Sequence, residues 1–158
     1  MAGRRNELST IGWREWVLLP EISAVSIKAK VDTGAQTSAL HARDLRIEQR
    51  GAEFWADFEV NPIQRSKQRS SRVTHPIRVF KKVKSSTGHT ESRPVIRTRI
   101  RLGNQEFDLD LTLTSRDAMG FRLLLGRAAL RRRFVIDPGR SFVHDLHTDS
   151  TSRRAPTS

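Results

Sequence analysis

The chain has 158 residues, no cysteine and a formal net charge of +12. This length suits one domain with a sizeable core, and the lack of cysteine excludes disulfides and thiolate metal sites. No apolar run reaches the length of a signal-peptide core or a membrane-spanning helix, so we expect a cytoplasmic protein without a membrane partner. The charge implies an anionic partner, and RNA, a ribosome or an acidic protein would each satisfy it.

The first residues, 1–10, are predicted to form a flexible tail, and residues 16–20 a first short strand ended by Pro20. Trp13 and Trp16 are interpreted as packing residues. In residues 27–31 apolar side chains alternate with lysines, which is the period of a half-buried strand. That strand runs into Asp32, Thr33 and Gly34. A glycine turns the backbone without a Cβ penalty, so the carboxylate is expected at the end of a rigid strand. An ordinary strand and turn would have the same composition.

The middle of the chain predicts a hairpin around residues 50–51 and then a basic mobile loop over residues 61–74. Residues 61–90 contain no aspartate or glutamate and eight lysines and arginines. This span is either a solvated surface or a collar that attracts anions. Residues 81–93 predict another hairpin, whose small polar tip contains Ser85, Ser86, Gly88 and His89. It is either a movable lid or a simple hairpin.

A tight turn at residues 103–104 predicts a further hairpin, in which Asp108 and Asp110 fall on the polar face. We expect these carboxylates to be solvated or paired with neighbouring arginines. An apolar run then closes on Gly126 and Arg127 and predicts a short helix over residues 127–133. Two last strands, 134–136 and 141–143, are predicted on either side of a turn at 137–139. Residues 147–158 are expected to be a flexible tail, which leaves an all-β domain over residues 11–146.

Asp32-Thr33-Gly34 and the later Leu125-Gly126-Arg127 together resemble the two halves of a retropepsin-like aspartic protease. Residues 11–17, 28–42, 85–98 and 124–127 resemble more closely a bacterial branch labelled ATP-dependent zinc proteases, which is associated with glutamate ligases of ribosomal proteins. The resemblance implies a closed β-barrel protomer with one or two short helices, acting as a two-fold homodimer. It implies catalytic roles for Asp32, Thr33 and Gly34. It places the flap and cleft at Ala35, Ser85, Ser86, Gly88, His89, Gly126 and Arg127.

Aspartic proteolysis needs two carboxylates that share a proton, and this chain holds a single Asp-Thr-Gly. The second carboxylate would therefore be Asp32 of another copy, with Thr33 reaching across to lock the two loops. In viral retropepsins the arginine after the late glycine pairs with an acid. The corresponding position here is Gln36, so Arg127 must find another partner or face an interface.

The zinc and ATP labels find little support in the residues. There is no His-Glu-x-x-His, and strand geometry would point His144 and His147 to opposite faces. His41 is interpreted as a packing or hydrogen-bonding residue. The chain has no Gly-x-x-x-x-Gly-Lys-Ser/Thr phosphate loop. We therefore expect no metal and no cofactor.

Two functions remain. The first is a homodimeric aspartic endopeptidase acting on acidic, glutamate-rich protein tails, with a ribosomal protein or a glutamate ligase as a partner. The alternative is a non-catalytic basic β-module that binds RNA, ribosome or an acidic protein. The alternative leaves both motifs as coincidence, and the sequence offers it no tyrosine and no evident interleaving of surface aromatics with basic residues.

Overall fold

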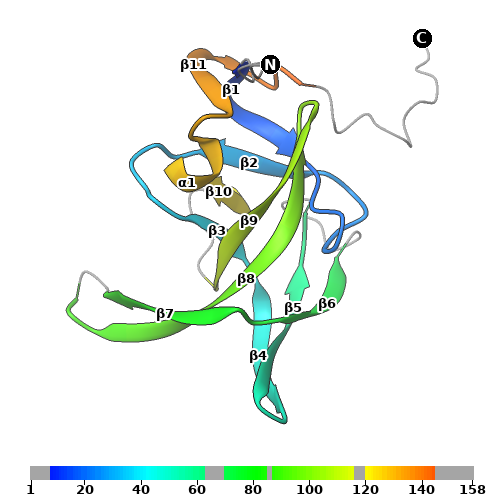
Figure 1. Cartoon of the computed structure of the whole chain (residues 1–158), viewed down its shortest axis with the longest axis vertical. Coiled ribbons are helices and arrows are strands. Elements are labelled where there is room, and N and C mark those ends of the chain that lie inside the picture. Colours follow the sequence, from blue (N-terminus) through cyan, green and yellow to red (C-terminus); the bar gives the residue numbers. More distant parts are fainter. Residues whose placement is uncertain (1–7, 63–69, 85–86, 116–119, 145–158) are drawn as a thin grey trace, which may run out of the picture.

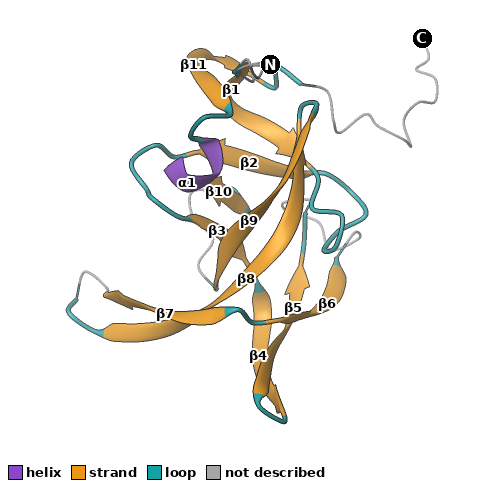
Figure 2. Ribbon diagram, viewed as in Figure 1, coloured by secondary structure: helices purple, strands orange, loops and turns teal. Residues whose placement is uncertain are grey.

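The computed structural model describes residues 8–62, 70–84, 87–115 and 120–144, and strands account for most of them (Figures 1 and 2). One short helix is present in this part of the chain. The elements in chain order are β1 (Ser9–Val17), β2 (Ile27–Val31), β3 (Ser38–His41), β4 (Arg43–Arg50), β5 (Glu53–Val60), β6 (Ser71–Pro76), β7 (Val79–Lys84), β8 (Thr90–Leu102), β9 (Gln105–Thr114), β10 (Leu123–Leu125), α1 (Arg127–Leu130) and β11 (Phe134–Ser141). The expected all-β class is confirmed.

The strands form an eight-stranded sheet and a three-stranded sheet. The larger sheet has the order β11-β1-β2-β10-β3-β9-β8-β7, and the smaller has the order β4-β5-β6. Strand β2 pairs antiparallel with β1 on one side and parallel with β10 on the other. The carboxyl ends of β2 and β10 therefore lie side by side, and this pairing positions the candidate site.

The expected closed barrel is not observed among the described residues, because the end strands β11 and β7 do not pair with each other. The sheet curls back on itself at one isolated bridge, where Leu18 meets Arg101. Two backbone hydrogen bonds of 2.9 and 3.0 Å make this bridge. The bridge lies near the end of β8, whereas the first residues of β8 pair with β7, so the long hairpin β7–β8 extends away from the body of the sheet (Figure 1).

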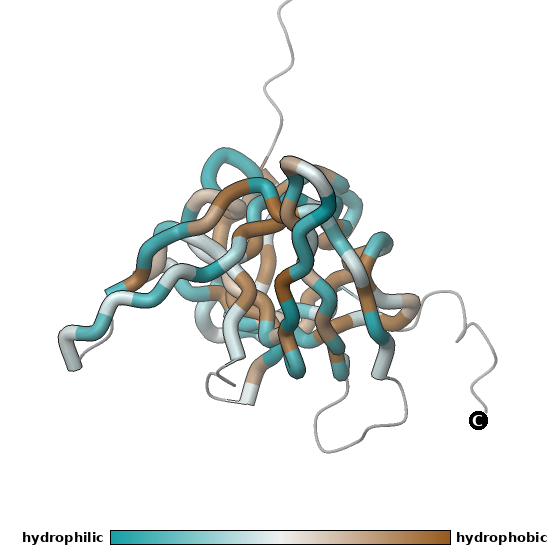
Figure 3. Tube along the Cα trace, turned by 90° about the horizontal axis from the view of Figure 1, so that it is seen from below, coloured by the Kyte–Doolittle hydropathy of each residue, from teal (hydrophilic) through white to brown (hydrophobic). Residues whose placement is uncertain are grey.

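Apolar and polar residues alternate along the strands (Figure 3), and the buried apolar side chains form one hydrophobic core cluster. Ile27 and Ala29 on β2, and Leu123 and Leu125 on β10, are fully buried. Burying one leucine or isoleucine side chain contributes about 1.5–3 kcal/mol. The two strands that end at the candidate site are thus anchored in the hydrophobic core. No helix in the described part of the chain is long and apolar enough to cross a bilayer.

The carboxylates of β9 pair with arginines, which is one of the two alternatives that the sequence left open. Asp110 accepts hydrogen bonds from Arg97 at 3.1 Å and Arg78 at 2.7 Å. Asp108 accepts one from Arg99 at 3.2 Å. Arg78, which the sequence placed in the possible anion-attracting collar, is therefore engaged within the fold.

Several predicted boundaries are wrong. The basic loop assigned to residues 61–74 ends earlier, because β6 begins at Ser71 and pairs with β5 throughout. Strand β1 begins at Ser9, inside the expected tail, and the predicted helix over 127–133 closes at Leu130. The expected turn at 137–139 lies within the continuous strand β11. Residues 63–69, 85–86 and most of both expected tails lie outside the described part of the chain.

Candidate active site

Asp32 stands where β2 ends and is fixed there by its neighbour β10. Its backbone N–H donates to the carbonyl of Leu125 at 2.8 Å, so the ladder between the two strands continues to this residue. The loop then turns back, with the amide of Ala35 donating to the Asp32 carbonyl at 3.2 Å. The amide of Gly34 donates to Asp32 Oδ1 at 3.1 Å. Asp32 is half-buried, whereas Thr33 and Gly34 are exposed. The backbone of β10 and the Gly34 amide therefore hold Asp32 in place, while its carboxylate remains partly open to solvent.

Gly126 locks this loop to the end of β10. A Cβ built on Gly126 would collide with the carbonyl of Thr37 and lie 2.9 Å from the carbonyl of Ala35. Its own buried N–H donates to the hydroxyl of Ser38 at 2.9 Å. The φ of Gly126 is −92°, which any residue can adopt, so the backbone conformation does not require a glycine. The glycine is required because a side chain would not fit between the approaching backbone segments.

The short helix α1 adds two more bonds to the same loop. The amide of Arg127 donates to the carbonyl of Ala35 at 2.8 Å, and that of Ala128 to the carbonyl of Gln36 at 3.0 Å. The first amides of a helix have no partner within the helix, and here the loop supplies their acceptors. The guanidinium of Arg127 turns over the loop and donates to the carbonyl of Thr33 at 2.9 Å. Asp32, Thr33, Gly34, Ala35, Gly126 and Arg127 therefore form one connected unit.

The residues of the predicted flap lie in the hairpin β7–β8. Strand β7 of this hairpin contacts the loop that carries Asp32. Lys81 Nζ donates to Thr37 Oγ1 at 3.2 Å. A recess of about 240 Å³ lies beside this contact, lined by Thr37, Val79, Phe80, Lys81, Val95, Asp110 and Thr112. Gly88 and His89 lie exposed at the far end of the hairpin, whereas Ser85 and Ser86 lie outside the described residues.

A second recess adjoins the exposed side of the loop that carries Asp32. It has a volume of about 250 Å³ and is lined by Thr33, Arg127, Leu130, Arg131, Phe134 and Ile136. Its apolar residues come from α1 and β11, directly after the Gly126-Arg127 segment. The loop that carries Asp32 therefore lines two recesses, one through Thr37 beside Lys81 and the other through Thr33.

Comparison with known proteins agrees with this arrangement. Residues 10–147 match the model of a family described as the retropepsin-like aspartic endopeptidase RimB. The chain belongs to this RimB-like family.

Curated relatives of the RimB-like domain have a different name. A probable alpha-L-glutamate ligase of Desulfotalea psychrophila is 44% identical over 128 residues, which are 81% of this chain and 28% of the relative. One from Shewanella pealeana is 42% identical over 132 residues, which are 84% of this chain and 29% of the relative. The domain thus spans less than a third of the curated relatives it matches, and their name describes the whole of those longer proteins.

A crystal structure of a protein with unknown function from Legionella pneumophila has the same fold. It superposes with a TM-score of 0.68 at 26% identity, covering 85% of this chain and 97% of the Legionella chain. The solved protein is therefore almost entirely one domain of this type.

In the described residues of the RimB-like domain, no group of three or more histidine or carboxylate side chains is arranged to hold a metal ion. His41 Nε2 lies 3.1 Å from the carbonyl of Ser115, in line with its predicted hydrogen-bonding role. His144 Nε2 lies 3.1 Å from the carbonyl of Thr10. His147, which the sequence predicts to point to the opposite face from His144, lies outside the described residues.

Sequence reasoning missed two side chains that shape the site. Ser38 is buried and accepts the amide of Gly126, and Lys81 reaches Thr37 in the loop after Asp32. Ser38 did leave a signal, since it occupies the same buried face of β3 as Leu40, where an apolar residue would be expected. The contact of Lys81 depends on how the hairpin β7–β8 folds toward the loop, which no local pattern encodes.

Proposed function

We propose that this RimB-like domain is an aspartic endopeptidase whose dyad consists of Asp32 from each of two copies. The observation that carries the proposal is the fixing of Asp32 by the Leu125 carbonyl beneath it and by the Gly126-Arg127 segment beside it. A solvated turn would need no such interlocking of three backbone segments. A non-catalytic module would leave this construction without a purpose.

The reaction follows from two close carboxylates that share one proton. The ionised Asp32 takes a proton from a water molecule, whose oxygen attacks the carbonyl carbon of the scissile bond. The protonated Asp32 of the second copy donates to the carbonyl oxygen. The tetrahedral intermediate then breaks its C–N bond, and the departing amine receives the proton taken from water. The ionised Asp32 of the second copy takes a proton back from a hydroxyl of the intermediate, which leaves as the carboxylic acid and restores the dyad. One Asp32 alone would provide either the base or the acid at the start of the cycle.

A second copy has a suitable surface to meet. Thr33 and Gly34 are exposed, and the hollow lined by Leu130, Phe134 and Ile136 continues from them. A two-fold axis beside Thr33 would place identical loops against each other and bury this apolar surface. Because Arg127 is engaged with the Thr33 carbonyl of its own chain, it stiffens each loop within its protomer.

For the substrate we propose acidic protein tails. The curated relatives combine a region like this domain with further sequence under the name probable alpha-L-glutamate ligase, and such a ligase would produce glutamate-rich chains. Lys81, Lys82 and Lys84 are exposed on β7, the hairpin strand whose Lys81 meets the catalytic loop. Exposed lysines raise the local concentration of an anionic chain, and salt weakens this attraction.

The test of this function is hydrolysis by Asp32→Asn, which keeps the size of the side chain but cannot ionise. We expect glutamate-rich peptides to be cleaved by the wild type and not by Asp32→Asn or Asp32→Ala, with unchanged circular dichroism. Cleavage by Asp32→Asn at the wild-type rate would refute the aspartic mechanism. Loss of activity on chelation with recovery on added zinc would instead establish a metal mechanism.

A further inference from the structure

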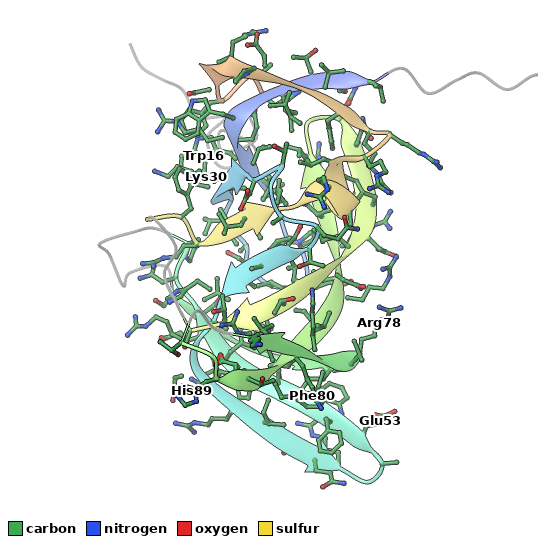
Figure 4. All side chains as sticks on the ribbon, turned by 90° about the vertical axis from the view of Figure 1, so that its left-hand side faces the viewer. Trp16, Lys30, Glu53, Arg78, Phe80 and His89 are labelled. Carbon is green, nitrogen blue, oxygen red and sulfur yellow. The ribbon has the colours of Figure 1, made fainter. Side chains whose placement is uncertain are left out.

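The outer face of β1 and β2 carries a group of aromatic and basic side chains far from the hairpin β7–β8. Arg14 pairs across the strands with Lys30, and Trp16 pairs with Lys28, so all four side chains share one face. Figure 4 shows Trp16 and Lys30 on the same side of the sheet. Trp13 and Phe121 adjoin them, with ring centroids 6.1 Å apart. We call Trp13, Arg14, Trp16, Lys28, Lys30 and Phe121 the aromatic–basic face.

Its cations lie against its rings. The Arg14 guanidinium is 4.6 Å from the centre of the Trp13 ring, and Lys28 Nζ is 5.2 Å from the centre of Phe121. Lys30 Nζ is 6.0 Å from the same ring. Such contacts hold positive charge directly over aromatic surface. The interleaving of aromatic and basic side chains that the sequence did not reveal is thus present in the fold, because Phe121 joins the strands from a distant segment.

The aromatic–basic face brings like charges close together. Like charges directly opposite each other on neighbouring strands are destabilising, and Arg14 faces Lys30. The nearest acid on β1, Glu15, is fully buried, where it accepts the amides of Gly12, Val143 and His144. Glu15 therefore adds no carboxylate to this surface. All six residues of the aromatic–basic face are half-buried, so part of each remains accessible to a ligand.

We propose that the aromatic–basic face binds single-stranded nucleic acid. Nucleic acids are the polyanions whose unpaired bases present flat faces, and proteins that bind single strands combine basic grooves with aromatic stacking platforms. Lysine and arginine contact phosphates, while indole and phenyl rings receive bases. A polyglutamate chain would satisfy the charges but would have nothing to stack. This activity is additional to the proposed hydrolysis.

The ring of Trp16 is the best-supported platform. It stacks on Phe142 with centroids 5.5 Å apart and an interplanar angle of 23°. Arg14, which lies 4.8 Å from the centre of Phe142, is itself held by a 3.1 Å hydrogen bond from its Nε to Ser141 Oγ. Phe142 and Ser141 thus hold the Trp16 ring and the Arg14 guanidinium in place, so these side chains lose little conformational entropy on binding.

The experiment is titration of the full chain with a labelled, unstructured 12-nucleotide RNA and its DNA counterpart, followed by anisotropy at several salt concentrations. Lys28→Gln/Lys30→Gln should weaken binding about tenfold and reduce the slope of log affinity against log salt by about 1.4, or 0.7 per lost phosphate contact. Lys82→Gln/Lys84→Gln removes the same charge from β7 and should weaken binding less than threefold. Equal losses in the two double variants would overturn the proposal by showing diffuse attraction.

Stacking is tested separately. Trp16→Leu should weaken binding about tenfold, and Trp16→Phe should restore most of the loss because a ring is kept. Tryptophan fluorescence should be quenched on binding, and Trp55→Phe should retain that quenching because Trp55 lies on β5 beneath Arg50. Wild-type affinity in Trp16→Leu would contradict a stacking platform. Displacement of the RNA by polyglutamate of equal charge at equal concentration would contradict the choice of nucleic acid.

Discussion

The guanidinium of Arg127 donates a 2.9 Å hydrogen bond to the backbone carbonyl of Thr33. The arginine therefore braces the loop that carries Asp32 from within its own chain. This contact explains how the chain accommodates Gln36 at a position where viral retropepsins have an acid. The backbone carbonyl replaces the missing carboxylate, while the carbonyl of Gln36 accepts the amide of Ala128.

Replacing Arg127 should impair catalysis more than folding. Arg127→Gln removes one charged donor at an exposed position and should destabilise the fold by about 1 kcal/mol or less. A loosened loop misplaces the carboxylate, so kcat should fall about tenfold or more while KM changes little. Peptide kinetics and thermal unfolding measure the two effects. Arg140→Gln, which removes the same charge at an exposed position of β11, is the control. A wild-type kcat in Arg127→Gln would show that the brace is dispensable.

Adding a methyl group at Gly126 should disrupt the interlocked loop. Gly126→Ala must push the carbonyls of Thr37 and Ala35 away, at a cost of about 1–3 kcal/mol typical of overpacking. Gly139→Ala is the matched control, because its Cβ would lie 3.5 Å from Asp137 Oδ1, an ordinary contact. Urea unfolding and peptide hydrolysis should both show a defect for Gly126→Ala alone. Equal stability of the two variants would mean that the loop yields freely.

The second sheet should contribute an acid-sensitive part of the stability. Arg72 donates to Asp44 at 2.9 Å, and this hydrogen bond holds the pKa of the Asp44 carboxyl below its ordinary value of 3.8. A group with a lowered pKa stabilises the fold above its unfolded pKa, and this contribution is lost as pH falls through the folded pKa. Asp44→Asn removes the charge while tolerating the positive φ of 49°.

Thermal unfolding across pH measures this contribution. The variant should unfold at a slightly lower temperature than the wild type near pH 6, and the difference should narrow as pH drops below about 4. The difference should be small, because the pair is exposed. A gap that widens toward low pH would reverse the assigned sign.

The lysines of β7 should favour acidic substrates. Lys82→Gln/Lys84→Gln should slow cleavage of peptides with glutamate-rich flanks at low salt and leave glutamine-flanked peptides unaffected. High salt should remove the difference between the variant and the wild type. Matched peptide sets at two ionic strengths provide the measurement. Equal rates for both flanks in the wild type at low salt would discard the electrostatic preference.

The sequence predicts what depends on alternation and on turn residues. It locates the strand before Asp32, the hairpin around residues 103–104 and the Gly126-Arg127 segment, because these have clear apolar periods or turn chemistry. It fails at β6, whose side chains are exposed or half-buried and which is held by pairing with β5. It also fails at β11, where Pro138 is accommodated because, among the described strands, this edge strand pairs with β1 alone.

Part of the candidate site could likewise be predicted from local sequence motifs, and part could not. Asp32, Gly126 and Arg127 stand in recognisable local motifs, so their proximity could be expected from the resemblance. The acceptors of Arg127 and Gly126, which are the Thr33 carbonyl and the Ser38 hydroxyl, depend on how separate segments approach in three dimensions. The aromatic–basic face likewise depends on the three-dimensional fold, because Phe121 comes from a distant segment and contacts Trp13 on β1 and Lys28 on β2.

In the proposed enzyme, each catalytic dyad takes one Asp32 from each of two copies. Mixing wild type with Asp32→Asn at constant total protein, above the dimer dissociation constant and after full exchange, tests it directly. With equal amounts, about one quarter of the dimers carry two aspartates, so the rate should fall to about one quarter of that of the wild type alone. A rate of about one half would mean that each copy works with its own Asp32, and would contradict the shared dyad.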